Sequence, residues 1–304
     1  MPELLITSQK AAEYRRWVTA ADLPGLVLVE APTPTCEIVF GEPALVRGLL
    51  PELPALRWVQ LTWAGAEALL DPSLRRDYRL TNARGVFGPL MSEYVFTYLL
   101  LHERKVLLRY AAQQQGRWEP SITGTLRGKT IGLLGVGTIG AHIAATAKHF
   151  GMRVHGYTRR SEACPQVDAY FHGTDLERFA SGLDYLVSVL PGTPTTRRII
   201  DAALLRALPK HALLINAGRG STLDEAALAD ALQQGRLAGA VLDVFEQEPL
   251  PPDHFFWRTP NLLITSHTAA PSFPQEITAL FSENYKRYIK GERLLHIVDF
   301  EEGY

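Results

Sequence analysis

The chain has 304 residues, 46% of them hydrophobic, and this length and composition predict two domains of ordinary size with buried cores. A formal net charge of -1 gives no reason to expect binding to nucleic acid or to an acidic membrane. The cysteines, Cys36 and Cys164, lie far apart and have no second thiol or histidine at metal-ligand spacing, so we expect no metal site and a reducing compartment.

The first block of the chain alternates short strand-like runs with turns and amphipathic stretches. Strands are predicted at 4–7, 26–29, 37–40, 57–61 and 79–81. The first of these runs resembles a strand instead of a charged leader, and no uninterrupted apolar run reaches membrane length. We therefore expect a soluble cytoplasmic protein that begins with a small parallel α/β unit of the flavodoxin-like kind.

A long helix is predicted over 91–115, ending near Gly116, as a bridge to a second block. There, predicted strands at 129–134, 153–157, 185–190, 211–216, 238–245 and 261–266 alternate with helical segments, which is typical of a doubly wound parallel (Rossmann) sheet. A last helix at 275–290 and a short tail lack a strand-helix repeat of their own. We therefore predict a substrate domain at 1–94 and 272–304, and a dinucleotide-binding domain at 95–271.

A glycine loop follows the strand at 129–134. Gly135 would permit a tight turn, Gly137 would let backbone amides approach a pyrophosphate, and Gly140 would allow close helix-strand packing. The helix that begins near Thr138 and Ile139 would offer its N–H groups to phosphate. The pattern indicates a dinucleotide site, with a purely structural turn as the alternative.

The sequence after the next strand bears on which coenzyme binds. An acid there would bind the ribose hydroxyls of NAD, but this chain has Thr158, Arg159 and Arg160. Guanidinium groups match phosphate oxygens in pairs of hydrogen bonds, so the sequence favours NADP, with NAD also possible. The alternative is a solvated basic turn.

Three chemically useful side chains each follow a strand of the second block. Arg219, Glu248 and His267 come after the runs at 211–216, 238–245 and 261–266, and the carboxyl ends of parallel strands share one edge of a sheet. Alone, each could be a solvated or structural residue. Together they fit reduction of a 2-oxo acid: a cation for the carboxylate, a proton donor for the carbonyl oxygen and an acid that favours the imidazolium form.

The chain resembles the D-isomer-specific 2-hydroxyacid dehydrogenase family in four motifs of the second block. These are Gly-Val-Gly-Thr-Ile-Gly at 135–140, Asn-Ala-Gly-Arg-Gly at 216–220, Asp-Val-Phe-Glu-Gln-Glu-Pro-Leu at 243–250 and Thr-Ser-His-Thr-Ala-Ala at 265–270. The basic coenzyme loop and short chain are most similar to the glyoxylate and hydroxypyruvate reductase branch. The resemblance implies a small 2-oxo acid substrate, a D-hydroxy acid product and a homodimer built around the 91–115 helix and Trp118.

The resemblance also implies roles for individual residues. Arg219 would bind the substrate carboxylate, Glu248 would pair with His267, and His267 would exchange the proton, with Glu246 as a competing acid. Substrate contacts are expected from Trp63, Ala64, Gly65, Arg219 and His267. The predicted coenzyme contacts are Gly135, Gly137, Thr138, Ile139, Gly140, Thr158, Arg159, Arg160, Pro191, Thr196, Ala217, Gly218 and, at the nicotinamide carboxamide, Asp243.

The sequence departs from the family pattern at two places. Family members often have proline before the histidine, where this chain has Ser266, and Gly-Val-Asp in the substrate loop, where it has Gly65-Ala66-Glu67. The second departure, next to the bulky Trp63, predicts a reshaped substrate pocket. Two alternative functions remain open: a dinucleotide-sensing interaction protein of the corepressor kind, because that class shares the fold and the triad, and a dehydrogenase of formate or phosphite.

Overall fold

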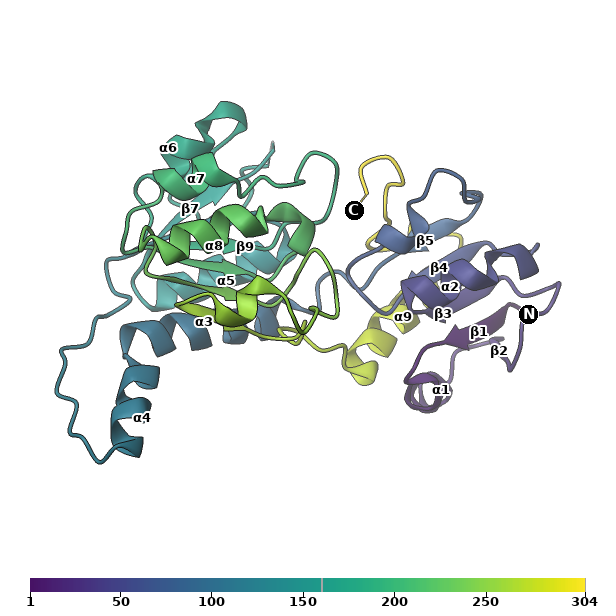
Figure 1. Cartoon of the computed structure of the whole chain (residues 1–304). Coiled ribbons are helices and arrows are strands. Elements are labelled where there is room, and N and C mark those ends of the chain that lie inside the picture. The colour runs from purple at the N-terminus through teal and green to yellow at the C-terminus, as the bar shows by residue number, and fades with distance from the viewer. Residues whose placement is uncertain (160, 304) are drawn as a thin grey trace. The chain divides into compact units, whose positions relative to one another are not determined.

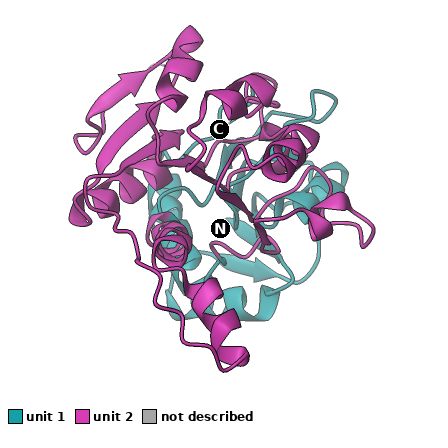
Figure 2. Ribbon diagram, turned by 60° about the vertical axis from the view of Figure 1, so that its left-hand side comes forward, with its two compact units in different colours: residues 1–87, 271–304 teal, residues 88–270 magenta. Residues whose placement is uncertain are grey.

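The computed structural model describes residues 1–159 and 161–303, which form two compact units (Figure 2). Unit 1 contains residues 1–87 and the described residues from 271 onward, and unit 2 contains residues 88–270. The sequence placed the first boundary at 94/95, inside the helix α3 (Gly88–Glu103). The whole of α3 lies in unit 2, since its Val95, Phe96 and Leu99 pack into a core cluster of that unit.

Unit 1 is built on a parallel sheet of five strands in the order β2-β1-β3-β4-β5 (Figure 1). This order confirms the predicted flavodoxin-like arrangement. The strands are β1 (Glu3–Thr7), β2 (Val27–Val29), β3 (Ile38–Gly41), β4 (Trp58–Leu61) and β5 (Arg79–Thr81). The helices are α1 (Ala11–Ala20), α2 (Pro43–Leu49) and α9 (Pro274–Ile289), with short 3-10 turns η1 (Leu50–Glu52) and η2 (Glu67–Leu69).

Helix α9 returns to unit 1 through an aromatic contact with the sheet. Phe281 stacks on Phe40 of β3 and on Trp58 of β4, with ring centroids 4.7 and 5.2 Å apart. All three side chains are fully buried. Burying large aromatic rings contributes a few kcal/mol each, which explains why the C-terminal segment joins the first block and not the second.

Unit 2 is built on a parallel sheet of seven strands in the order β12-β11-β10-β9-β6-β7-β8, which confirms the predicted doubly wound topology. Its strands are nearly all apolar because helices cover both faces. The strands are β6 (Thr130–Leu134), β7 (Arg153–Tyr157), β8 (Ala169–Phe171), β9 (Tyr185–Ser188), β10 (Leu213–Asn216), β11 (Gly239–Leu242) and β12 (Leu262–Ile264). The edge strand β8, of three residues, is not among the predicted strands.

The helices of unit 2 follow the strands, except for α3 and α4 (Val106–Gln114), which precede them. The single helix predicted over 91–115 is wrong, because Lys105 takes the left-handed conformation at φ 51° and ends the regular turn between α3 and α4. The others are α5 (Thr138–His149), α6 (Leu176–Ala180), α7 (Ala202–Ala207) and α8 (Glu225–Gln233), with 3-10 turns η3 (Gly173–Asp175), η4 (Gly220–Thr222) and η5 (Phe255–Arg258).

Candidate active site

The glycine loop lies between β6 and α5 and forms an open cradle at the start of that helix. Gly135 has φ 95°, a backbone angle that residues with a side chain rarely adopt. A Cβ on Gly140 would lie 2.2 Å from the carbonyl oxygen of Gly135. A Cβ on Gly137 would meet no atom within 4 Å, so the space above this residue is open. A backbone that is open at a helix N-terminus fits a pyrophosphate, and the loop therefore fits a dinucleotide.

The coenzyme loop follows the carboxyl end of β7, and a histidine from the edge of the sheet holds it. His172 follows β8, and its Nδ1 lies 2.8 Å from the carbonyl oxygen of Thr158 while its Nε2 lies 2.7 Å from Glu162. Arg159 is exposed at the end of β7, and Arg160 lies outside the described residues. Sequence reasoning missed His172, since a strand of three residues gave no signal of its own.

Two further loops bring predicted coenzyme contacts to the same edge of the sheet. After β9, the hydroxyl of Thr196 donates to the carbonyl oxygen of Pro191 at 2.6 Å. After β10, Ala217 is buried, and a Cβ on Gly218 would lie 2.6 Å from the carbonyl oxygen of Leu190. The loops after β9 and β10 are therefore packed against each other without room for larger residues.

The loop after β10 also fixes Arg219. A Cβ on Gly220 would lie 1.9 Å from the carbonyl carbon of Phe245, so only glycine lets this loop approach the one after β11. The carbonyl oxygen of Arg219 accepts hydrogen bonds from Thr222 at 2.6 Å and Asn216 at 3.1 Å, and its Nη1 donates to Gly218 at 2.7 Å. The backbone from which the guanidinium group extends is therefore fixed in place.

His267 and Glu248 form a hydrogen-bonded pair at the carboxyl edge. Nδ1 of His267 lies 2.7 Å from Oε2 of Glu248, and Oε1 of Glu248 accepts the backbone N–H of Phe245 at 2.9 Å. The two side chains are 55% and 34% exposed. A carboxylate only accepts, so Nδ1 carries the proton and Nε2 is the nitrogen that is left for chemistry.

The electrostatics of the pair favour a charged imidazole. The hydrogen bond to Glu248 raises the pKa of His267, against the opposing effects of burial and of Arg219. Burial raises the pKa of Glu248, but the hydrogen bonds from His267 and Phe245 and the charge of Arg219 together hold it below its usual value. Arg219 is thus close enough to act on both partners, and the structure brings the three predicted catalytic residues together.

Glu246, the competing acid, interacts with arginines and not with His267. Its carboxylate accepts from Arg197 at 2.9 Å and lies 3.6 Å from Arg198, while its backbone N–H donates to Glu225 at 2.9 Å. Glu248 is therefore the acid that holds His267.

Asp243 anchors the loop that carries His267. Its buried carboxylate accepts from the Thr265 hydroxyl at 2.5 Å, the Thr268 N–H at 2.8 Å and the Ala269 N–H at 3.0 Å. Its carbonyl oxygen accepts the N–H of His267 at 2.8 Å. His267 has φ 54°, a conformation that costs free energy and needs support from the surrounding structure. The hydrogen bonds to Asp243 keep the loop in this conformation. The predicted nicotinamide contact of Asp243 stays a prediction.

The predicted substrate loop belongs to unit 1 and follows β4. Asn82 donates from Nδ2 to the carbonyl oxygen of Ala64 at 2.7 Å, and the N–H of Ala83 donates to Trp63 at 3.0 Å. Trp63 is 48% exposed. The loop therefore has a fixed backbone, and its contacts with substrate, including those of Gly65, stay predictions.

Over residues 1–159 and 161–303, the structure describes neither a metal-ligand cluster nor a helix that is long and apolar enough to cross a membrane.

The glycine loop, the coenzyme loop and the three polar residues that the sequence indicated all lie at the carboxyl edge of the unit 2 sheet. This is the edge at which doubly wound sheets bind their ligands.

Comparison with known proteins agrees with this geometry. Residues 96–269 match the family model "D-isomer specific 2-hydroxyacid dehydrogenase, NAD binding domain". The glyoxylate/hydroxypyruvate reductase A of Photorhabdus laumondii is 34% identical over 267 residues, which are 84% of each chain. A crystal structure of a D-isomer specific 2-hydroxyacid dehydrogenase family protein from Aeromonas salmonicida has a TM-score of 0.91 and 42% identity, covering 98% of this chain and 99% of that one.

A second solved structure carries its ligands. The NADPH-dependent glyoxylate/hydroxypyruvate reductase of Sinorhizobium meliloti, in complex with NADP and sulfate, has a TM-score of 0.91 and 28% identity, with 100% of both chains covered. The match to the family model spans more than half of this chain, and the curated relative exceeds 30% identity over most of it. The chain belongs to the D-isomer specific 2-hydroxyacid dehydrogenase family.

Proposed function

We propose that this protein reduces a small 2-oxo acid of the glyoxylate or hydroxypyruvate type to the D-2-hydroxy acid with NADPH. The observation that carries the proposal is the 2.7 Å contact between His267 and Glu248, with Arg219 close enough to shift the pKa of both. Family membership makes the protein a dehydrogenase, and its curated and solved relatives include glyoxylate/hydroxypyruvate reductases. They favour this reaction over a corepressor role or the oxidation of formate or phosphite.

Each of the three residues has a part in the reaction. Arg219 binds the substrate carboxylate and polarises the carbonyl, and its tethered backbone limits the positions of the guanidinium. Glu248 keeps His267 protonated and oriented, and Nε2 of His267 gives its proton to the carbonyl oxygen. The bound coenzyme supplies the hydride that adds to the carbonyl carbon. Oxygen and carbon thus receive one proton and one hydride, which gives the hydroxy acid.

The coenzyme is held by unit 2. The cradle at Gly135, Gly137 and Gly140 takes the pyrophosphate, and the exposed Arg159 takes the 2′-phosphate that distinguishes NADP from NAD. Unit 2 is then the coenzyme domain and unit 1 the substrate domain, with Trp63, Ala64 and Gly65 as its contribution to substrate binding. A reducing cytoplasm suits the two free cysteines, both of which are buried.

The test is the consumption of NADPH and of NADH with glyoxylate, hydroxypyruvate, pyruvate and a bulkier 2-oxo acid, followed by the chirality of the product. We expect turnover with NADPH and either glyoxylate or hydroxypyruvate, with a D product where the product is chiral. Binding of NADPH without reduction of any 2-oxo acid would contradict the proposal and favour a coenzyme-sensing role. Reduction of NADP by formate or phosphite alone would favour the third class.

We also propose a homodimer formed through α4 and the segment after it. Trp118 and Ile122 are 93% and 88% exposed, and α4 presents half-exposed Leu107 and Leu108. Figures 1 and 2 both show α4 projecting from the rest of unit 2. Light scattering should give twice the monomer mass, and the double substitution Leu108→Asp with Ile122→Asp should give monomers. A wild-type monomer at micromolar concentration would contradict the dimer.

A further inference from the structure

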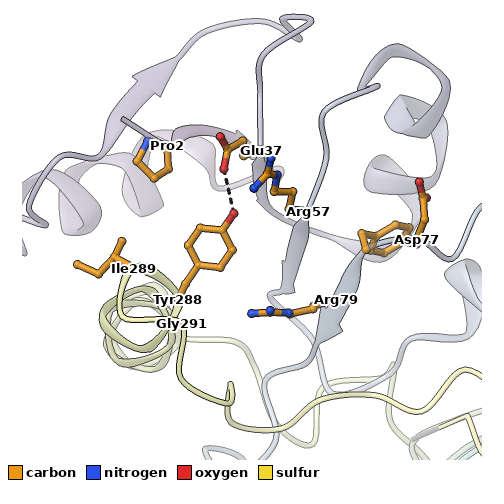
Figure 3. Close-up of a pocket in the computed structure, with 9 residues that line it drawn as sticks. Pro2, Glu37, Arg57, Asp77, Arg79, Tyr288, Ile289 and Gly291 are labelled. Carbon is orange, nitrogen blue, oxygen red and sulfur yellow. Dashed lines mark hydrogen bonds between the residues drawn. The ribbon is translucent and has the colours of Figure 1, made fainter.

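An open cavity of about 640 Å³ lies in unit 1 at the amino ends of two neighbouring strands. Arg57 directly precedes β4, Arg79 is the first residue of β5, and the N–H of Arg79 donates to the carbonyl oxygen of Arg57 at 2.9 Å. Figure 3 shows the side chain of Arg79 extending toward Tyr288 of α9 and the side chain of Arg57 extending toward Glu37. The substrate loop with Ala64 follows the opposite, carboxyl end of β4, so the cavity is separate from it within unit 1.

The carboxylates that line the cavity already have partners. Asp77 accepts from Nε and Nη2 of Arg75 at 2.6 and 2.8 Å, and Glu37 accepts the hydroxyl of Tyr288 at 3.0 Å. Burial and the bond to Glu37 raise the pKa of Tyr288 to about 12, so this hydroxyl stays a donor. By contrast, neither Arg57 nor Arg79 forms an ion pair or a side-chain hydrogen bond in the part of the chain that the structure describes.

We propose that this cavity binds a small organic anion, whose carboxylate or phosphate group bridges the guanidinium groups of Arg57 and Arg79. Two planar guanidinium forks match the oxygens of such a group in geometry and charge. Arg75, which is outside the lining, neutralises Asp77, so the remaining charged groups of the wall are Arg57, Arg79 and Glu37, with positive charge in excess. Pro2 and Ile289 add apolar wall for the rest of the ligand.

Binding at this place acts on the core of unit 1. The ring of Tyr288 stacks on Trp58 at 5.4 Å, and Trp58 stacks in turn on Phe281. A ligand that binds only the folded cavity stabilises that fold by mass action, so the midpoint of thermal unfolding of the full chain should rise with anion concentration.

The experiment is a calorimetric titration of inorganic phosphate and, separately, of malonate into the full-length protein saturated with NADP. All samples carry Arg219→Gln, which removes the other arginine expected to bind an oxyanion. Binding of NADP is measured first, so that its failure, which would count against the proposed function, is recognised separately. The site uses none of the proposed catalytic residues, and the two proposals can fail independently.

The test variant is Arg57→Gln with Arg79→Gln, and the matched control is Arg15→Gln with Arg16→Gln, which removes two positive charges from α1 of the same unit. We expect saturable binding of phosphate or malonate that the test variant weakens at least tenfold and the control leaves unchanged. Binding of only one anion would identify the group as phosphate or carboxylate. Equal affinity in the test variant, or no saturable binding by either anion, would overturn the proposal.

A crystal soaked in selenate gives a readout that does not depend on variants. If the titration shows that phosphate binds, the proposal requires an anomalous peak between the guanidinium groups of Arg57 and Arg79, and if malonate alone binds, it requires malonate density at the same place. An anion that binds in the titration but is found in the crystal only at the glycine loop or at Arg219 would overturn it.

Discussion

Nδ1 of His267 lies 2.7 Å from Oε2 of Glu248, and this contact gives the imidazole both its orientation and its charge. The carboxylate has a second anchor, because its Oε1 accepts the N–H of Phe245. His267 is itself held in the left-handed conformation by the N–H bond to Asp243. Two residues of the loop after β11 therefore fix the proton donor, Asp243 through its backbone carbonyl group and Glu248 through its carboxylate.

Replacing His267 by Gln should lower kcat for 2-oxo acid reduction by about 10²- to 10⁴-fold, the range for loss of a general acid. The dissociation constant of NADP should stay near the wild-type value, because the proposed coenzyme contacts lie on other loops. Steady-state kinetics and a fluorescence titration of coenzyme measure the two quantities. Turnover close to the wild-type rate would remove His267 from the mechanism.

Replacing Glu248 by Gln should move the pH profile of reduction toward acid. The proton donor is the imidazolium, so the rate falls as pH rises through the pKa of His267. Glu248 raises that pKa, and its neutral replacement lowers it, so the fall should occur at lower pH than in the wild type. Oxidation of the hydroxy acid needs neutral imidazole, so its rate should rise as pH rises through the pKa of His267. In Glu248→Gln this rise should also occur at lower pH than in the wild type.

The variant Glu248→Asp distinguishes charge from general disturbance of the loop. It keeps the carboxylate and should restore part of the shift in the pH profile that Glu248→Gln removes. An unchanged profile in Glu248→Gln, measured with the same substrate, would show that the 2.7 Å contact does not set the proton affinity of His267.

Asp243 offers a test of the loop anchor. The carboxylate of Asp243 accepts from Thr265 and Thr268 through one oxygen and from Ala269 through the other. In Asp243→Asn one of these oxygens becomes an NH₂ group, which must then face a backbone N–H. A buried donor facing a donor costs about 1–3 kcal/mol. We expect a lower free energy of unfolding by about that amount, together with a lower kcat. Urea unfolding with unchanged stability would contradict the proposed anchoring role.

The sequence predicted the order of the unit 2 strands apart from β8, because the buried parallel strands are apolar runs followed by polar loops. The runs predicted at 185–190, 238–245 and 261–266 nevertheless extend two or three residues beyond the ends of β9, β11 and β12. Arg219, Glu248 and His267 could be assigned to one sheet edge on that basis, and the glycine loop could be placed residue by residue. The choice between Glu246 and Glu248 rested on family resemblance, since spacing alone does not tell which carboxylate turns toward His267.

What the sequence missed depended on contacts between distant segments. His172 holds the coenzyme loop from β8, which is too short to show a periodic pattern. The break at Lys105 was hidden because the residues on both sides favour helix, and only a left-handed residue separates α3 from α4. The accepting role of Asp243 joins β11 to the loop after β12 and has no local signature.

Gly220 should be intolerant of a side chain. Gly220→Ala places a Cβ where the carbonyl carbon of Phe245 would be 1.9 Å away, so the Arg219 loop must move from the Glu248 loop. We expect KM for the 2-oxo acid to rise and kcat to fall, with reduced stability. Gly182→Ala is the matched control in unit 2, since its Cβ would meet nothing within 4 Å. Similar kinetics for the two variants would show that the close approach is dispensable.

Arg159 should set the preference between coenzymes. Its exposed side chain follows β7, where a guanidinium meets the 2′-phosphate of NADP, and a charged hydrogen bond is worth about 1.5–3 kcal/mol. Arg159→Gln should therefore weaken NADP by about 10- to 100-fold and leave NAD nearly unchanged. Arg178→Gln, an exposed arginine of α6 in the same unit, controls for loss of charge. Equal weakening of both coenzymes by Arg159→Gln would mean that this residue supports the fold of the loop and does not read the phosphate.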